Sequence, residues 1–204
     1  MSVLTAAYNI RNMVRGFARR REKDPRTCIL RRIPKHSVCA EIGVYKGDFS
    51  ALILEREPKE LHLIDPWKFE PEGTYTSSWY GGTVGKSQAN MDDIYISVLG
   101  RYRDAISSGI VKVHRNTSAA SCAQFPDNYF DWIYIDGNHR YEFVKCDLDM
   151  FWTKVKVHGL VAGDDYAEPG WWQDGVTKAV DEAIASGRFE KVLIKNHQFL
   201  IRKR

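Results

Sequence analysis

Short apolar runs alternate with amphipathic segments along most of the chain. Seven of the runs have the length of β-strands, and they cover residues 37–42, 61–64, 110–113, 132–135, 157–162, 191–194 and 199–201. Such runs separated by helical patterns are typical of βαβ units, in which helices cover both faces of a parallel sheet. Only four residues separate the last two runs, which is too short for a parallel crossover. The pattern therefore predicts an α/β fold, a three-layer α/β/α sandwich with a mostly parallel seven-stranded sheet and an antiparallel C-terminal edge hairpin.

The N-terminal segment follows a different pattern. Apolar residues recur every three or four positions in residues 2–20, which predicts an amphipathic helix. Residues 1–35 hold ten Lys or Arg and two acids, whereas the net charge of the whole chain is +4. We expect residues 1–36 to form a basic helical extension and residues 37–204 to form one domain. The basic face is either solvated or contacts nucleic acid, an anionic membrane or an acidic partner. The helix itself is expected to dock on the domain or on another subunit in a homo-oligomer.

The composition of the chain bears on the number of its domains and on its cellular compartment. A chain of 204 residues has room for one sizeable core. Its four cysteines form no CxxC pair, which is typical of reduced thiols. No apolar stretch approaches the roughly 20 residues needed to cross a bilayer, and the sequence contains no secretory signal pattern. We therefore expect a cytoplasmic protein without a transmembrane segment.

A first candidate site follows the first two predicted strands. Glu41 ends a buried run, and Gly43 and Gly47 follow in a turn where the backbone can approach a ligand closely. A dinucleotide-binding turn has glycine where Glu41 stands, and a carboxylate there repels pyrophosphate but suits a cationic ligand. Asp65 ends the next strand, at the spacing where an acid binds ribose hydroxyls. The order predicts a nucleoside site, and the alternative for the glycines is an ordinary tight turn.

A second candidate site follows two later strands. Asp136 and His139 come directly after one strand, and Asp164 and Asp165 come after the next. If the two strands are neighbours, the three carboxylates converge, and such crowding is costly without a cation. Oxygen ligands in this number favour Mg²⁺ or another divalent cation. The alternative is that one or two of these acids cap the following helices.

The stretch from Pro66 to Lys86 is rich in aromatic residues and glycine and has no clear period, which is typical of a binding loop. Aromatic walls commonly hold sugars or planar rings. The aromatic residues that we expect near the site, each of them equally compatible with a place in the core, are Trp67, Trp79, Tyr80, Tyr166, Trp171 and Trp172. Residues 81–87 approach a phosphate-binding P-loop, but Tyr80 stands in place of the first glycine and no strand precedes it.

Four motifs in order carry a resemblance to a known family: E-I-G-V-Y-K-G at 41–47, L-I-D-P-W at 63–67, D-W-I-Y-I-D-G-N-H-R-Y-E at 131–142 and G-D-D-Y at 163–166. Together they resemble the class I S-adenosylmethionine (SAM)-dependent methyltransferases of the Methyltransferase-24 type. That group is similar to the metal-dependent sugar O-methyltransferases of macrolide and aminocoumarin pathways. The resemblance covers residues 37 to about 202 and implies a Rossmann-like fold.

The resemblance also implies roles for individual residues. Glu41, Gly43 and Gly47 are implied to line the methionine end of SAM, and Asp65 to hold its ribose. Asp136, Asp164 and Asp165 are implied to bind the metal, and Asp136 is also implied to contact the cofactor. His139 is implied to act as general base, and Asp136 is the second expected catalytic residue. Asn116, Thr117 and Ser118 stand where relatives contact adenine, and a helix N-cap is an equally good interpretation of Thr117 or Ser118.

The function that these residues predict is metal-assisted methylation of a hydroxyl oxygen. A metal lowers the pKa of a bound hydroxyl, and His139 would remove its proton. The expected acceptor is a hydroxylated small molecule such as a sugar or a phenol, and nucleic acid is not expected as substrate. The alternative is a noncatalytic module that binds SAM or a nucleotide, with the basic N-terminal helix on nucleic acid or an anionic surface.

Overall fold

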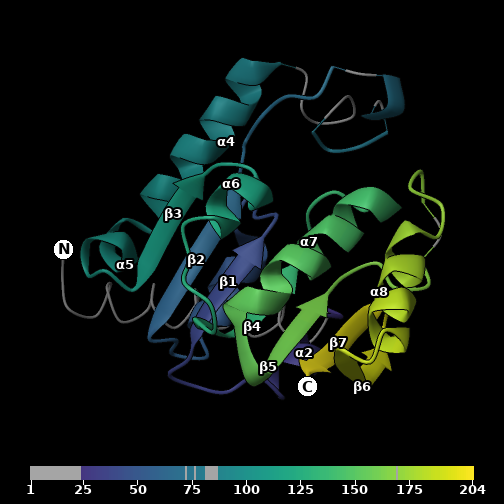
Figure 1. The fold of residues 1–204 in the computed structure, drawn as a ribbon. Helices are drawn as coiled ribbons and strands as arrows, with labels where there is room; N and C mark the ends of the chain where they lie inside the picture. The colour runs from purple at the N-terminus through teal and green to yellow at the C-terminus, as the bar shows by residue number, and fades with distance from the viewer. Residues whose placement is uncertain (1–23, 72, 76, 81–86, 169) are drawn as a thin grey trace.

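Seven strands form one twisted sheet in the computed structural model of the chain, which describes residues 24–71, 73–75, 77–80, 87–168 and 170–204 (Figure 1). The helix predicted for residues 2–20 lies outside this described part. The strands are β1 (Val38–Ile42), β2 (Glu60–Asp65), β3 (Val111–Arg115), β4 (Phe130–Ile135), β5 (Val155–Gly163), β6 (Phe189–Lys195) and β7 (Gln198–Lys203). The seven predicted strands are therefore confirmed, with most bounds moved by one or two residues.

The strand order is β3-β2-β1-β4-β5-β7-β6. β1 pairs in parallel with both β2 and β4, and β2–β3 and β4–β5 are parallel as well. β7 is antiparallel to β5 and to β6. The predicted mostly parallel sheet with an antiparallel edge hairpin is confirmed. The direction of strand order reverses between β1 and β4, which places a crevice at their carboxyl ends.

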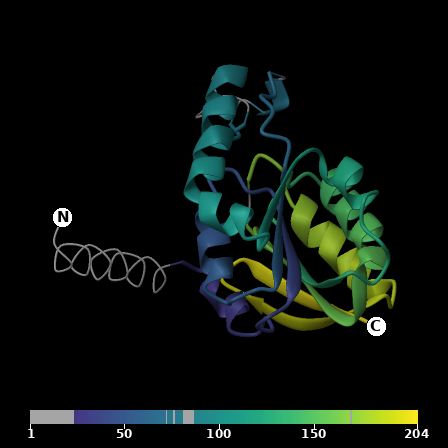
Figure 2. The same ribbon diagram turned by 90° about the vertical axis from the view of Figure 1, so that its left-hand side faces the viewer.

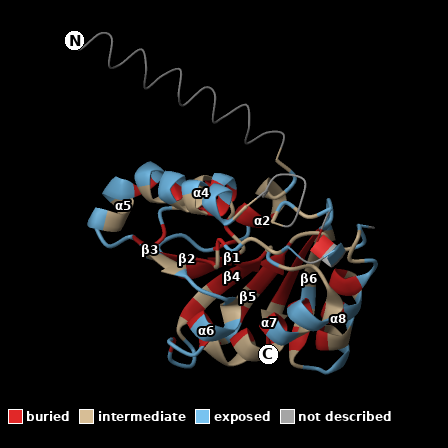
Figure 3. Ribbon diagram, turned by 90° about the horizontal axis from the view of Figure 1, so that it is seen from above, coloured by how far each residue is buried: buried red, intermediate tan, exposed pale blue. Residues whose placement is uncertain are grey.

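Helices cover both faces of this sheet. They are α2 (Thr27–Leu30), α3 (Asp48–Leu54), α4 (Gln88–Arg101), α5 (Arg103–Ser107), α6 (Ser118–Cys122), α7 (Tyr141–Lys154) and α8 (Gly175–Ala185), with a 3₁₀ turn at Gly73–Tyr75. Residues of α2, α3 and α4 share one buried cluster, and residues of α7 and α8 share the other. Figure 2 shows α4 in teal on one side of the sheet and the green and yellow-green helices on the other, and Figure 3 shows the same division from above. None of the described helices is long and apolar enough to cross a membrane.

The central strands are apolar at nearly every position because both of their faces are covered. All five residues of β1 are buried. In β4, Trp132 and Tyr134 point to the cluster with α3, whereas Ile133 and Ile135 point to the cluster with α7. The indole of Trp132 also donates a 2.9 Å hydrogen bond to the hydroxyl of Ser37, so this large side chain has no unpaired donor in the core.

Part of the predicted N-terminal extension belongs to the core. Ile29, Leu30 and Ile33 are 0%, 4% and 2% exposed and pack in the same cluster as α3. Apolar burial of this extent ties the chain from residue 27 to the sheet. The boundary at residue 36 stays a prediction, but residues 29–33 just before it pack in the core and do not form a solvated arm.

Candidate functional site

A cavity of about 1260 Å³ opens at the carboxyl ends of β1, β4 and β5, where open α/β sheets bind ligands. The acids on its wall are Asp24, Glu41, Asp48, Asp136, Asp164 and Asp165. The cations and the histidine on its wall are Arg26, Lys46, Arg101 and His139. The excess of acids suits a positively charged ligand.

Gly43 lets the turn after β1 lie directly against the loop after β4. Its φ is +88°, and a Cβ there would lie 2.0 Å from the backbone oxygen of Asp136. The backbone N–H of Asp136 donates a 2.7 Å hydrogen bond to the carbonyl of Ile42. Gly47, with φ +74°, precedes α3 and accepts a hydrogen bond from the hydroxyl of Tyr102. The two glycines therefore bring the predicted nucleoside turn and Asp136 to one edge of the cavity.

Glu41 is buried at the end of β1. It is 1% exposed, and one of its carboxylate oxygens accepts a 2.5 Å hydrogen bond from the hydroxyl of Ser50. Burial raises the pKa of Glu41 to about 8, with the Ser50 hydrogen bond opposing the shift. A positively charged ligand group beside Glu41 would favour its ionised form.

Asp65 is saturated by hydrogen bonds from its own chain. Its Oδ2 accepts from the backbone N–H groups of Val44 at 2.8 Å and Tyr45 at 2.9 Å and from the hydroxyl of Tyr80 at 2.5 Å, and its Oδ1 accepts from the N–H of Trp67 at 2.7 Å. The carboxylate is 1% exposed and is not part of the cavity wall, because Tyr80 covers it. Its role as ribose acceptor stays a prediction that requires Tyr80 to move.

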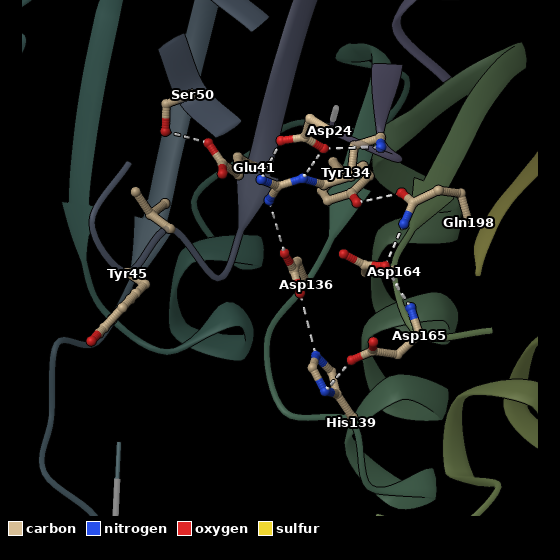
Figure 4. A network of polar contacts seen from close by, with 12 residues as sticks. Asp24, Glu41, Tyr45, Ser50, Tyr134, Asp136, His139, Asp164, Asp165 and Gln198 are labelled. Carbon is tan, nitrogen blue, oxygen red and sulfur yellow. Dashed lines mark hydrogen bonds and ion pairs between the residues drawn. The ribbon is translucent and has the colours of Figure 1, made fainter. Parts of the chain in front are cut away.

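The structure brings Asp136, His139 and Asp165 together (Figure 4). His139 Nδ1 lies 2.7 Å from Asp165 Oδ2, and Nε2 lies 3.3 Å from Asp136 Oδ1. Burial lowers the pKa of His139, but the two carboxylates outweigh burial and raise it to about 10. One ligand atom from each residue lies within 4.8 Å of the other two, so the three can enclose a divalent cation. Without one, His139 is an imidazolium between two carboxylates.

Asp164, the third predicted metal ligand, lies beside this cluster and points into a buried network (Figure 4). Its Oδ1 accepts hydrogen bonds from the amide of Gln198 and, at 2.8 Å, from the backbone N–H of Asp165. Gln198 in turn accepts a 2.6 Å hydrogen bond from the hydroxyl of Tyr134. Burial and the charge of Asp136 raise the pKa of Asp164 to about 7. Of the predicted ligands, Asp136 and Asp165 are thus brought together, and His139 stands where Asp164 was expected.

Asp165 has a strained backbone. Its φ is +61°, in the left-handed region that non-glycine residues rarely adopt, although aspartate tolerates it better than most. This conformation turns the Asp165 carboxylate toward His139 and away from the direction taken by Asp164. Strain of this kind is often found at functional sites.

Ser118 lies away from the cavity. It begins α6, and the preceding Thr117 is the N-cap, whose hydroxyl accepts a 3.2 Å hydrogen bond from the N–H of Ala120. A hydrogen bond from Ser118 partly offsets the burial that raises the pKa of Asp147 to about 6. The helix-cap interpretation of Thr117 is therefore confirmed, and the adenine contact of Ser118 stays a prediction.

The predicted aromatic residues divide into two groups. Trp79, Tyr80, Trp171 and Trp172 are on the cavity wall, and Trp172 packs edge-on against His139 with ring centroids 4.8 Å apart. Trp67 is fully buried and donates its indole N–H to the carbonyl of Tyr45 at 2.8 Å. Tyr166 bonds to Asp181 on α8. Trp67 and Tyr166 are therefore structural. The region that approaches a P-loop lies mostly outside the described residues, and Ser87 at its end caps α4.

Sequence analysis did not single out Arg26. This residue precedes α2, and its guanidinium reaches into the cavity, where it pairs with Asp24 at 2.7 Å and lies 3.7 Å from Asp136. It lies within the basic segment, and its charge resembled that of the neighbouring arginines. The available signal was its position two residues after Asp24 and three residues before the buried run that begins at Ile29.

Comparisons with known proteins identify the family and the fold of the chain. A family model described as a methyltransferase domain, Methyltransf_24, matches residues 40–166. A putative caffeoyl-CoA O-methyltransferase from Staphylococcus aureus has a TM-score of 0.58 at 11% identity, over 100% of this chain and 93% of that chain. The O-methyltransferase TomG from Streptomyces achromogenes, in complex with SAM, has a TM-score of 0.55 at 14% identity, over 82% and 73% of the two chains. The N-methyltransferase NodS from Bradyrhizobium japonicum has a TM-score of 0.54 at 12% identity, over 92% and 97%.

At these identities the solved structures establish the fold alone, and no curated protein matches the sequence. The family model, by contrast, spans more than half of the chain and covers the residues from β1 to the end of β5 that build the cavity. By its family match and its strand order, the chain belongs to the Methyltransf_24 family of class I SAM-dependent methyltransferases.

Proposed function

We propose that the protein transfers the methyl group of SAM to a hydroxyl oxygen of a small molecule. The observation that carries this proposal is the convergence of Asp136, His139 and Asp165 at the edge of a large, partly aromatic cavity. Two acids and an imidazole at that place can hold and deprotonate a hydroxyl group, whereas amine methylation needs no such set of anionic groups.

The methionine end of SAM would lie against Glu41 and Gly43, at the acidic end of the cavity. The ammonium and sulfonium groups of SAM are cationic, and the excess of acids on the wall favours them. The ribose would take the place of the Tyr80 hydroxyl on Asp65. Asp136, which touches the Gly43 turn, would lie between cofactor and acceptor.

Methyl transfer is an in-line displacement. A lone pair of the acceptor oxygen forms the O–CH₃ bond, the C–S bond breaks with its electrons passing to sulfur, and the hydroxyl proton passes to His139. The protein therefore needs to align oxygen, carbon and sulfur and to receive one proton. His139 can accept it only in its neutral form, and neutralising the charges of Asp136 and Asp165 favours that form.

Asp136 and Asp165 are the proposed ligands of a divalent cation such as Mg²⁺, with Asp164 as the third ligand if it leaves Gln198. Carboxylate oxygens are the ligands that Mg²⁺ prefers. Burial, together with the negative charge of Asp136, raises the pKa of Asp164, and a cation would compensate that charge. A cation bound there would lower the pKa of an acceptor hydroxyl and orient it.

The proposed acceptor is a sugar or a phenol. Trp79, Trp171 and Trp172 offer indole faces and edges on the cavity wall, and Trp79 is 61% exposed, so it is free to cover a ring. TomG and the putative caffeoyl-CoA enzyme are named as O-methyltransferases, whereas NodS is named as an N-methyltransferase. The choice of oxygen therefore rests on the site and not on these neighbours.

Calorimetry with S-adenosylhomocysteine (SAH), with and without Mg²⁺, tests the proposal, together with transfer of labelled methyl from SAM to a panel of sugars, phenols and amines. We expect SAH binding, Mg²⁺ binding that is lost in Asp136→Asn, and label in an alcohol or phenol. Asp127→Asn is the matched control, because Asp127 is an exposed acid that pairs with Lys154 at 2.8 Å. Label confined to amines would exclude the oxygen assignment, and absence of SAH binding would exclude the cofactor.

We further propose that the protein works in the cytoplasm and forms a homo-oligomer through the helix predicted for residues 2–20. All four cysteines, Cys28, Cys39, Cys122 and Cys146, are free, which suits a reducing compartment. The helix lies outside the described residues, so the second part rests on its amphipathic pattern. Light scattering of the full chain beside a chain starting at residue 22 tests it, with a smaller assembly expected for the shorter chain.

A further inference from the structure

Arg26 is held rigidly at the wall of the cavity. Its Nε donates a 2.9 Å hydrogen bond to Asp24 Oδ1, and its Nη2 donates a 2.7 Å hydrogen bond to Asp24 Oδ2. The guanidinium carbon lies 4.6 Å from the centre of the Phe49 ring. Directly after it, α2 is anchored in the core by Ile29. The Asp24 carboxylate therefore holds one edge of the planar guanidinium, and the Phe49 ring covers one of its faces. These two contacts fix the direction of the guanidinium.

The third nitrogen of the guanidinium, Nη1, has hydrogen-bond donors left for a ligand. Among the described residues Nη1 donates no hydrogen bond, and it forms an ion pair with Asp136 at 3.7 Å. The side chain is 21% exposed and faces the cavity, and Asp24 holds its pKa above the usual value against the effect of burial. Arg26 therefore presents a permanent positive charge with unused donors next to the turn after β1.

Anionic and cationic groups thus stand side by side at this end of the cavity. Arg26 interacts electrostatically with two acids, Glu41 and Asp136. An α-amino acid group carries an ammonium and a carboxylate on one carbon, so it needs both kinds of partner within a few ångströms. Acids alone would hold the ammonium and repel the carboxylate.

We propose that Arg26 binds the α-carboxylate of the methionine end of SAM through Nη1, with Asp24 as the residue that positions the guanidinium. The proposal rests on the proposed function only in placing that end of SAM against Glu41 and Gly43. It gives the segment before β1, which the family match at residues 40–166 does not include, a direct part in cofactor binding.

The other two cations on the wall are directed elsewhere. Arg101 donates to the carboxylate of Asp48 at 2.8 Å and to the backbone carbonyl of Lys46 at 3.2 Å. Lys46 is exposed, and its ammonium lies 5.1 Å from the centre of the Tyr45 ring. Arg101 therefore makes a suitable control, since it lines the same cavity with the same charge.

The test compares two ligands by calorimetry: SAH, and its decarboxylated analogue, which keeps the adenosine, the thioether and the ammonium. We expect the wild-type protein to bind SAH about 10- to 100-fold more tightly than the analogue, the range of one charged hydrogen bond. In Arg26→Gln this preference disappears, because affinity for SAH falls to the level of the analogue. Arg101→Gln keeps the full preference, and Asp24→Asn, with a less fixed guanidinium, keeps part of it.

Three outcomes would overturn the proposal. If the Arg26→Gln variant still binds SAH more tightly than the analogue by the wild-type factor, another group binds the carboxylate. Equal loss of affinity for both ligands would show that Arg26 only supports the fold of the site. Equal affinity of the wild-type protein for SAH and for the analogue would show that no residue binds the carboxylate. Wild-type protein that binds neither ligand would instead refute the proposed function itself.

Removal of Arg26 alone leaves Asp24 without its partner, which can destabilise the protein. The double variant Asp24→Asn/Arg26→Gln removes both charges and is tested in the same way. Thermal unfolding of each variant confirms that the fold is retained. The expected result is the same loss of preference for SAH, with affinity for the decarboxylated analogue within about twofold of the wild-type value.

Discussion

The hydroxyl of Tyr80 donates a 2.5 Å hydrogen bond to Oδ2 of Asp65, the carboxylate at the end of β2. The other three donors to Asp65 are backbone N–H groups of Val44, Tyr45 and Trp67, which belong to the turns around the carboxylate. Tyr80 is therefore the side-chain donor, among the described residues, that a ribose can replace without refolding the site. Ribose and Tyr80 compete for the same oxygen.

Replacing Tyr80 with phenylalanine should consequently tighten SAH binding. Loss of a competing hydrogen bond worth about 1 kcal/mol corresponds to roughly a fivefold lower Kd. Calorimetry on Tyr80→Phe measures the change, and Tyr95→Phe, whose ring packs against Trp67 with centroids 5.0 Å apart, is the matched control. Weaker SAH binding in Tyr80→Phe would mean that the Tyr80 hydroxyl contacts the bound cofactor and does not compete with it.

Gly43→Ala should destabilise the protein far more than an alanine at another glycine with positive φ. At Gly43 the new methyl would lie 2.0 Å from a backbone oxygen, so the β4 loop must shift. Gly109 has φ +80° and no atom within 4 Å of its Cβ position, so Gly109→Ala adds backbone strain alone. We expect a loss of about 1 kcal/mol in the free energy of unfolding for Gly109→Ala and at least about 3 kcal/mol for Gly43→Ala. Urea denaturation measures both, and equal losses would contradict the close approach of the two loops.

His139 should titrate far above an ordinary histidine when no divalent cation is present. The carboxylates of Asp136 and Asp165 overcome the effect of burial and raise its pKa to about 10. In Asp165→Asn we expect the pKa to fall by at least about one unit, because one stabilising negative charge is gone. NMR of the imidazole nitrogens against pH gives the values directly. A pKa near 6.5 in the wild-type protein would show that the two carboxylates do not hold the imidazolium in solution.

A second histidine should make stability depend on pH. His62 is 3% exposed, lies 2.9 Å from the ring nitrogen of His114 and is surrounded by the rings of Phe125 and Phe130. Burial, reinforced by the charge of His114, lowers the pKa of His62 to about 4. The unfolded chain therefore binds a proton near pH 6.5, before the folded chain does, so the free energy of unfolding falls as pH drops from about 6.5 to about 4 and is lower by up to about 3 kcal/mol at the end of this window.

Urea denaturation between pH 4 and pH 7 measures this dependence. His62→Phe, which keeps an aromatic ring in the pocket, should flatten the slope in that window. His158→Gln, at an exposed position, is the control and should keep the wild-type slope. An unchanged slope in His62→Phe would assign the pH dependence to other groups, such as His114, whose pKa burial also lowers.

The fold could be predicted from the local pattern of apolar residues, because a parallel sheet covered on both faces has a simple pattern in the sequence. Its strands are short continuous apolar runs, and all seven were recognisable as such. The hairpin of β6 and β7 followed from a connection too short for a parallel crossover. The helix caps at Thr117 and Ser87 are also local, since they depend on residues three positions apart.

Of the site, only the residues that directly follow the strands could be predicted from the sequence. Asp136 and Asp165 were expected together because β4 and β5 are neighbours, and they are. Whether Asp164 or His139 joins them depends on the left-handed backbone of Asp165 and on Gln198, which approaches from β7 and is 34 positions away from Asp164 in the chain. Arg26 could not be distinguished from a solvated arginine by charge counting.

The sequence by itself determined the element order, the family and the residues available at the carboxyl ends of the strands, because periodicity, turn residues and motif spacing are properties of neighbouring positions. Tertiary structure alone decided that Tyr80 covers Asp65, that two carboxylates hold His139 as a cation and that Arg26 enters the cavity. Each of these depends on burial and on distances between groups that are far apart in the chain. Those two quantities set the hydrogen bonds and the pKa values on which the proposed chemistry rests.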